Sequence, residues 1–224
     1  MGYAVIIDIV GSIIVGGFLL LMLFGLNDST VRNTYHFSGE LSVQENLVSV
    51  VDVLEFDFRK IGYCEDPAAL PHPEENAIRY ADTSEIIFLT DLMTGYGSGS
   101  GDGIVDTVRY YLGPTSELSE TPNPSDRILY RVVNSSTPVG ANLGVTQFRI
   151  RYFRDSLTAS GGTTLAEIVP ADLPKVFVTG TPTGITAMQI DIKVENTASY
   201  DSENNDYRNA FWRQIRLSSR NLKR

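Results

Sequence analysis

The feature that most constrains this chain is an apolar segment near its start that leads into a region without proline. Residues 3–26 read YAVIIDIVGSIIVGGFLLLMLFGL and contain one charge, Asp8, and no Lys or Arg. A helix needs about 20 apolar residues to cross the hydrocarbon core of a bilayer, so this segment is long enough to span a membrane. All ten prolines lie at or beyond Pro67, so no earlier residue fixes φ and removes a helix hydrogen-bond donor.

The helical pattern continues after the apolar segment. Apolar residues recur at i, i+3 and i+4 on one face, which is typical of an amphipathic helix: Leu47, Val50, Val51, Leu54, Phe58 and Ile61. We therefore expect one helix from Met1 to about Tyr63, with any interruption near Gly39 or within residues 27–40. The start lacks the basic region and small-residue cleavage pattern of a signal peptide, so we expect the apolar segment to be kept as an anchor.

The remainder of the chain reads as short strands between polar loops. Alternating apolar and polar residues predict strands at 84–90, 103–112, 127–133, 144–153, 187–195 and 211–217. We expect residues 63–84 to be a proline-rich connector and residues 155–164 to be a loop. Half-buried alternation is typical of an antiparallel sheet with one wet face.

In the strand at 187–195, the residues expected on the wet face are Gln189, Asp191, Lys193 and Glu195. The residues expected to pack against the helix stripe are Ile150, Tyr152, Ile190, Ile192 and Ile215. The predicted fold class is α+β, with a long amino-terminal helix packed on an antiparallel β-sheet domain. The expected divisions are a transmembrane half of the helix (1–26), an amphipathic half (27–63) and a globular β-sheet domain (64–224).

Three residues within the apolar segment are candidates for subunit assembly. Asp8, Ser12 and Gly16 recur every four residues and so share one helix face. The spacing from Ser12 to Gly16 allows another helix to approach closely in an apolar medium. A carboxylate in hydrocarbon needs a partner or must be neutral. Alternatively, Asp8 is close enough to the end of the segment to reach water at the headgroups.

The sequence contains few residues suited to catalysis or metal binding. The two histidines and the single Cys64 cannot form a recognisable zinc set, and phosphate-binding and nucleophile motifs are missing. We therefore expect no enzyme activity, no small-molecule substrate and no cofactor. A Ca²⁺ site at Asp91, Asp102 and Asp106, which flank a glycine-rich loop, remains a secondary hypothesis, and we favour solvated loop acids as the explanation of these residues.

The overall charge argues against a nucleic-acid partner. The chain has 27 Asp and Glu against 18 Lys and Arg, a net charge of −9, whereas binding phosphates requires bases to neutralise them. The carboxyl-terminal stretch from Arg208 to Arg224 is the local exception, with six basic residues and no acid. We interpret it as a solvated strand face followed by a chain terminus.

These features together resemble type IV pilins and type II secretion pseudopilins. An apolar amino-terminal helix with one acid near its start, an amphipathic continuation and an antiparallel sheet domain are shared with that superfamily. The minor-pilin W and minor-pseudopilin J group is similar over further segments: EFDFRKIGY, IIFLTDLMTG, GDGIVDTVRYYLG, RILYRVV, GVTQFRIRYF and IRLSSRNL. That group closes its final strand with a similar arginine-rich turn, which here ends in Arg220 and Asn221. The family usually carries Glu as the fifth mature residue, whereas a cut after Gly2 would make Asp8 the sixth.

The resemblance implies a structural subunit of a type IV pilus-like or type II secretion pseudopilus filament. Its partners would be copies of itself or other pilin-like subunits, and it would be held in the bacterial inner membrane before assembly. The globular domain would lie outside the cytoplasm, and the filament would be periplasmic or extracellular. The alternative is a single-span, membrane-anchored β-domain that binds a ligand or partner protein without forming filaments.

Overall fold

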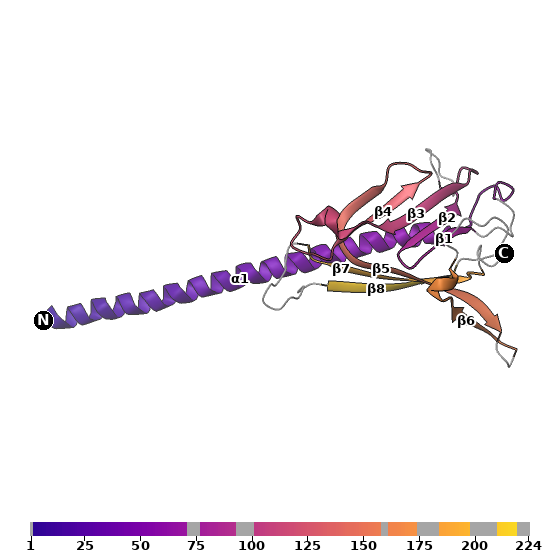
Figure 1. Cartoon of the computed structure of the whole chain (residues 1–224). Coiled ribbons are helices and arrows are strands. Elements are labelled where there is room, and N and C mark those ends of the chain that lie inside the picture. Colours follow the sequence, from indigo (N-terminus) through magenta and orange to yellow (C-terminus); the bar gives the residue numbers. More distant parts are fainter. Residues whose placement is uncertain are drawn as a thin grey trace. The chain divides into compact units, whose positions relative to one another are not determined.

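The computed structural model describes residues 2–70, 77–92, 101–157, 161–173, 184–197 and 210–218. Within these residues the chain forms one long helix, α1 (Gly2–Arg59), and two short 3₁₀ turns, η1 (Thr115–Leu118) and η2 (Pro170–Asp172). The strands are β1 (Ile78–Ala81), β2 (Glu85–Thr90), β3 (Asp106–Leu112), β4 (Arg127–Val133), β5 (Val139–Leu157), β6 (Thr163–Glu167), β7 (Ala187–Glu195) and β8 (Ala210–Leu217). Figure 1 shows these elements with their labels.

The long amino-terminal helix is present, and it is continuous from Gly2 to Arg59. No interruption occurs near Gly39 or elsewhere within residues 27–40. A single glycine costs a helix only about 1 kcal/mol relative to alanine, so it weakens the helix without breaking it. The helix ends in a turn that contains Gly62, whose φ is 71°, a value that glycine adopts without strain. The Gly62 N–H donates to the carbonyl of Leu89 at 2.9 Å and so joins the end of α1 to β2.

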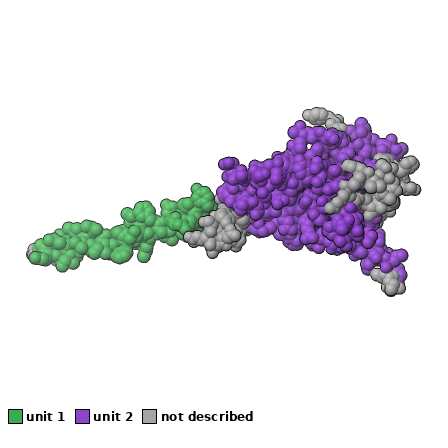
Figure 2. All heavy atoms as spheres, viewed as in Figure 1, with its two compact units in different colours: residues 1–42 green, residues 43–224 purple. Residues whose placement is uncertain are grey.

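The chain divides into two compact units, which are residues Met1–Ser42 and Val43–Arg224 (Figure 2). The first unit consists of the amino-terminal part of α1. The second contains the carboxyl-terminal part of α1, from Val43 to Arg59, together with all the described strands. The division of the chain at residues 26 and 63 follows the apolar and amphipathic patterns of the sequence and stays a prediction.

The second unit is built on an antiparallel sheet with strand order β1-β2-β3-β4-β5-β7-β8, and β6 pairs with β5. The longest strand, β5, pairs with β4 through its first part and with β7 and β6 through its later parts. Gly144 lies where β5 passes from one partner to the next, with a φ of 72°. A Cβ at Gly144 would collide with the backbone carbonyl of Glu195, so only glycine fits this position.

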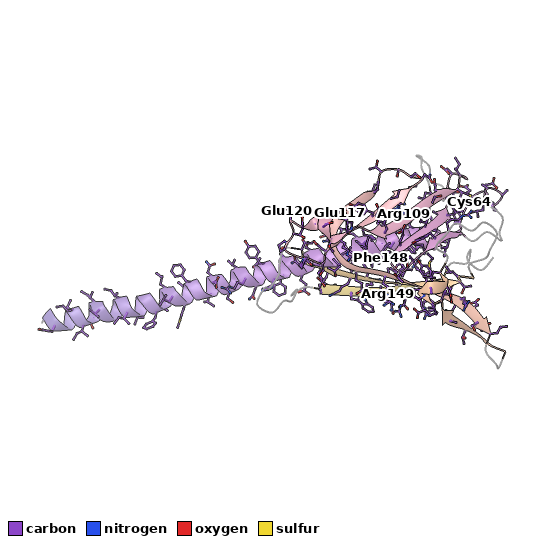
Figure 3. The ribbon with its side chains drawn as sticks, in the orientation of Figure 1. Cys64, Arg109, Glu117, Glu120, Phe148 and Arg149 are labelled. Carbon is purple, nitrogen blue, oxygen red and sulfur yellow. The ribbon has the colours of Figure 1, made fainter. Side chains whose placement is uncertain are left out.

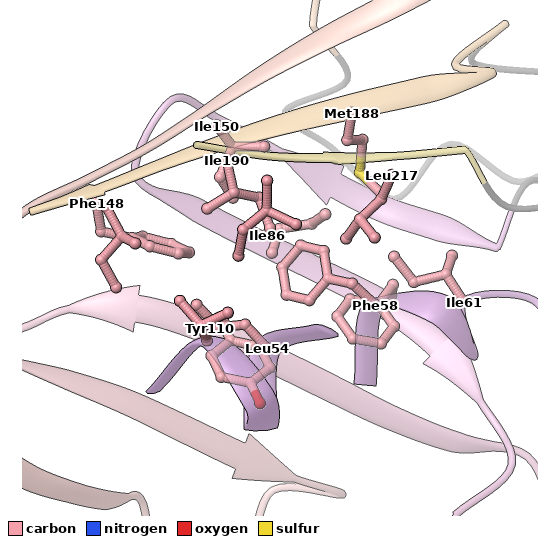
Figure 4. Close-up of a cluster of buried hydrophobic side chains, with 14 of the residues drawn as sticks. Leu54, Phe58, Ile61, Ile86, Tyr110, Phe148, Ile150, Met188, Ile190 and Leu217 are labelled. Atoms are coloured by element: carbon pink, nitrogen blue, oxygen red, sulfur yellow. The ribbon is translucent and has the colours of Figure 1, made fainter. Parts of the chain in front are cut away.

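The hydrophobic core lies between the sheet and the carboxyl-terminal part of α1. The helix stripe predicted from the sequence is buried there, and Figure 4 shows Leu54, Phe58 and Ile61 facing the strands. All five sheet residues expected to pack against the stripe belong to the same buried cluster. The predicted α+β class, with a long helix packed on an antiparallel sheet, is confirmed.

Several local expectations were wrong. Strand β1 lies inside the expected connector 63–84, and β6 begins inside the expected loop 155–164. Both strands are short and are held by pairing with a neighbour, β2 or β5, which no local pattern reveals. The solvent-exposed face expected for β7 was also wrong, because three of its four residues, Gln189, Asp191 and Glu195, are buried.

Candidate functional site

The first candidate site is the apolar surface of the first unit. From Gly2 to Ser38, every side chain that the structure describes is exposed. The large apolar residues Ile13, Leu21 and Phe24 expose 64–68% of their area, and the side chains project from the helix (Figure 3). Within the described residues, α1 is long and apolar enough to cross a membrane. So large an exposed apolar surface indicates contact with lipid or with other protein chains.

The predicted assembly residues lie together on this helix. Since α1 is continuous, Asp8, Ser12 and Gly16 lie on one face, one turn apart. The Ser12 hydroxyl donates to the backbone carbonyl of Asp8 at 2.8 Å, so its polar group is satisfied within the helix. Among the described atoms, none outside the helix backbone lies within 4 Å of the position that a Cβ on Gly16 would occupy. The face therefore offers a carboxylate next to a stretch that another helix could approach closely.

The end of the apolar segment is marked by polar groups that the helix itself satisfies. Arg32 Nε and Asp28 Oδ2 form an exposed i,i+4 ion pair at 3.0 Å. The hydroxyls of Thr30 and Thr34 donate to carbonyls four residues earlier, at 2.8 and 2.9 Å. Hydroxyl side chains that bond back to the helix in this way are compatible with its continuation. The helix thus passes without a break from an apolar to a polar surface.

A buried ion pair attaches α1 to the sheet in the second unit. The Asp57 carboxylate accepts hydrogen bonds from Arg131 Nε at 2.5 Å, from Arg131 Nη2 at 3.2 Å and from the Tyr110 hydroxyl at 2.5 Å. Burial and then the charge of Asp57 raise the pKa of Tyr110 far above its usual range. Burial lowers the pKa of Arg131, but its hydrogen bonds to Asp57 and the charge of Asp57 reverse this and raise it. Both shifts stabilise the neutral Tyr110 hydroxyl and the charged Arg131 guanidinium as hydrogen-bond donors to Asp57.

The sequence analysis missed this ion pair, although two signals could have found it. Asp57 lies in phase with the buried stripe, next to Phe58, and a charge on a core face needs a partner. Arg131 lies on the inward side of β4, two residues after Leu129. Pairing them correctly would have required the strand order.

The three carboxylates of the calcium hypothesis lie at loop ends. Asp91 accepts hydrogen bonds from the backbone N–H groups of Glu65, Asp102 and Gly103, at 2.8–3.0 Å. Burial alone would raise the pKa of Asp91, but these amide hydrogen bonds outweigh it and hold that pKa below its usual value. Asp106 accepts hydrogen bonds from the Leu92 N–H and from the side-chain amide of Asn134.

These contacts give Asp91 and Asp106 a structural role at the base of the glycine-rich loop. A Cβ at Gly101 would collide with the Asp91 carboxylate, so residues 101–103 are closely fitted around it. Burial also raises the pKa of the neighbouring Cys64 thiol. Over the described ranges, no group of three metal-ligating side chains could hold an ion. Residues 93–100 of the loop lie outside those ranges, and the calcium hypothesis stays a prediction.

The outer face of the sheet carries a further polar cluster around Asp191 on β7. Its carboxylate accepts hydrogen bonds from Arg151 Nη2 at 3.1 Å, Gln214 Nε2 at 2.8 Å and Gln189 Nε2 at 3.2 Å. Glu195 forms an ion pair with Lys193 and accepts a hydrogen bond from Asn123. Because β5 and β8 flank β7, Arg151 and Gln214 reach Asp191 from either side, and both carboxylates are buried on the face that was expected to be wet.

Comparisons with known proteins give a likeness among solved structures but none among family models or curated proteins. No family model matches the sequence, and no curated protein matches it either. Among solved structures, the type IV-like pilin TTHA1219 from Thermus thermophilus is similar at a TM-score of 0.40 and 13% sequence identity. The match covers 81% of this chain and 98% of that chain.

Proposed function

We propose that this protein is a structural subunit of a type IV pilus-like or type II secretion pseudopilus filament. The observation that carries the proposal is the continuity of α1, which runs from Gly2 to Arg59. Its first part is an exposed apolar surface, and its last part, from Val43, is built into the core of the sheet domain. A domain that is merely tethered to a membrane needs no such helix, because a flexible linker serves equally well.

Two environments stabilise the exposed apolar part of α1. Before assembly it lies in the bacterial inner membrane, with the globular domain outside the cytoplasm. In the filament it packs against copies of itself or against other pilin-like subunits, which bury the same surface. The resemblance of the sequence to the minor-pilin W and minor-pseudopilin J group is in keeping with this role. We assign no catalytic step to the protein.

Asp8 is the residue that we propose to set the register of assembly. No Lys or Arg lies before Arg32, so we take the cation to be the amino terminus of a neighbouring subunit. Each residue of a helix adds about 1.5 Å along its axis, so an amine at the start of the helix lies apart from Asp8 within the same subunit. A neighbour displaced along the axis brings its own amine alongside.

The proposed pair between Asp8 and a neighbour's amine selects the register of assembly more than it adds to stability. Opposite charges attract strongly in a medium of low dielectric constant, but desolvation consumes much of the gain. A subunit in the wrong register leaves a carboxylate buried without a partner, which is costly. The pair therefore acts mainly by excluding wrong registers.

Imaging filaments from the source cells and identifying their subunits by mass spectrometry tests the proposal. We expect the protein to be present in filaments, Asp8→Ala to abolish or slow its incorporation, and Asp8→Glu to retain part of it. Membrane insertion should be unchanged in each variant. Asp28→Ala is the matched control, because Asp28 is an exposed carboxylate on the same helix beyond the apolar segment. Normal filaments with Asp8→Ala would refute the role of Asp8, and a protein that stays in the membrane would favour the anchored binding domain.

A further inference from the structure

The outer face of β5, β7 and β8 carries a concentration of positive charge. The strand register places three rows of side chains across this face: Gln147, Lys193 and Trp212; Arg149, Asp191 and Gln214; and Arg151, Gln189 and Arg216. We call these nine residues the arginine face. Arg149 points away from the core while its neighbour Phe148 points into it, as Figure 3 shows.

The acids on or beside this face are already compensated. Asp191 is buried and bonded to Arg151, Gln189 and Gln214. Glu195 is buried and paired with Lys193. The exposed charge that remains is that of the basic side chains, of which Arg149 and Arg216 are the most accessible. A positive surface on a chain whose net charge is −9 favours an acidic partner.

An exposed aromatic residue lies at the edge of the same face. Trp212, the single tryptophan of the chain, is 57% exposed on β8. Nearby on the sheet, the Arg216 guanidinium lies over the ring of Phe153 at 5.0 Å. Tryptophan and arginine are the residue types most enriched among energetically dominant contacts of protein interfaces. The composition of the arginine face is thus that of a protein-binding surface.

A complementary surface exists on the same unit. The side of α1 that faces away from the sheet exposes the acids Glu45 and Asp52 beside three apolar residues, Val48, Val53 and Phe56, each at least half exposed. The sequence contains no Lys or Arg between Arg32 and Arg59. We call these five residues the acidic helix face. Because α1 covers the inner side of the sheet, this face and the arginine face lie on opposite sides of the second unit and cannot meet within one molecule.

We propose that the acidic helix face of one copy of this chain docks on the arginine face of another copy. Glu45 and Asp52 would approach Arg149 and Arg216, while the apolar helix residues would cover Trp212. Two different surfaces joined in this way form a heterologous interface, which repeats without closing unless a rotation closes a ring. The proposal rests on the filament role proposed above and specifies a contact between neighbouring globular units.

Cysteine cross-linking of the full-length protein in cell membranes and in recovered filaments tests the contact. We expect the chain carrying both Asp52→Cys and Arg149→Cys to give a ladder of dimers, trimers and larger species with a short bis-maleimide. A mixture of the two single variants should give dimers alone. The matched control combines Asp52→Cys with Glu120→Cys, an exposed position on a different surface, and should give no ladder. Cys64 is buried and is present in every variant, so its background is common to all.

Reversing the charges on each face provides a second test of the contact. Arg149→Glu with Arg216→Glu should reduce cross-linking of a Val53→Cys and Gln214→Cys pair about fivefold, because exposed ion pairs contribute only about 0.2–1 kcal/mol each. Glu45→Arg with Asp52→Arg on the same chain should restore it.

The outcomes separate the proposed contact from the proposed filament role. A ladder of equal strength from the control pair, or cross-links to a different protein identified by mass spectrometry, refutes docking between copies. Filaments that contain the protein without any ladder refute the contact and leave the filament role standing. A ladder in membranes from a protein that filaments lack supports the contact and refutes the filament role.

Discussion

Replacing Phe58 by alanine tests whether the helix and the sheet form one core. Phe58 is 0% exposed. Its ring centroid lies 5.3 Å from that of Phe88 on β2 and 5.5 Å from that of Tyr110 on β3, both in tilted arrangements. The side chain therefore fills the space between α1 and the first strands of the sheet, and Figure 4 shows it there.

The size of the effect follows from what the substitution removes. Phe→Ala changes in cores cost about 3–5 kcal/mol, from lost burial and from the cavity left behind. This cost includes the loss of two aromatic pairs, each worth about 0.5–1.5 kcal/mol beyond its buried area. Because strands bound the site on one side and the helix on the other, the cavity can collapse only partly. We expect a loss of about 4 kcal/mol, a large share of the roughly 5–15 kcal/mol available to a domain.

Urea unfolding of residues 28–224, followed by far-UV circular dichroism, measures this loss. With a slope of about 2 kcal/mol per M urea, the unfolding midpoint should fall by about 2 M. Phe56→Ala is the matched control, since Phe56 lies on the same helix but is 57% exposed. Its ring carries the Lys60 ammonium at 4.5 Å, so its removal should cost no more than about 1 kcal/mol. Equal losses from the two variants, or a loss below about 0.5 kcal/mol for Phe58→Ala, would refute the assigned core face.

Three further predictions concern the second unit. In dilute solution, without the apolar segment that holds copies together in a membrane or filament, residues 28–224 should sediment as a folded monomer and show no saturable turnover of small substrates; turnover abolished by one side-chain change would contradict this. Arg131→Met should lower the free energy of unfolding in urea more than Asp57→Ala, by about 3–5 against about 2–3 kcal/mol. The reason is that Arg131→Met leaves the Asp57 carboxylate, which is 1% exposed, without its partner, whereas the Arg131 side chain is 32% exposed and can reach water. The reverse order would contradict the argument. The lowered pKa of Asp91 contributes stability that is complete above its ordinary value of 3.8 and is lost as the pH falls through the folded-state pKa. Asp91→Asn should therefore lower the urea midpoint near pH 7. Between about pH 5 and about pH 3 the variant should lose less stability than the parent protein, because it lacks the titrating carboxylate. Equal pH profiles for the two proteins would exclude stabilisation by ionised Asp91.

Local periodicity determined much of the architecture. The absence of proline before Pro67 and the stripe from Leu47 to Ile61 predict the long helix and its buried face. Alternation predicts the bounds of β4 and β7 within the same residues that the structure gives. These signals are local because a helix or strand shows its buried face through spacings of two to four residues. The α+β class follows from them.

The tertiary structure decided which strands are neighbours, and with that the polar clusters. Asp191 alternates with apolar residues and reads as solvated, yet it is buried because Arg151 from β5 and Gln214 from β8 close over it. The pairing of Asp57 with Arg131 likewise joins residues 74 positions apart. For Asp8, Ser12 and Gly16, the sequence fixes a shared helix face through spacing alone, and the structure adds the continuous backbone that carries it. Burial of a charge depends on side chains that arrive from distant segments, so spacing along the chain determines the face of a residue, and only the fold determines what covers it.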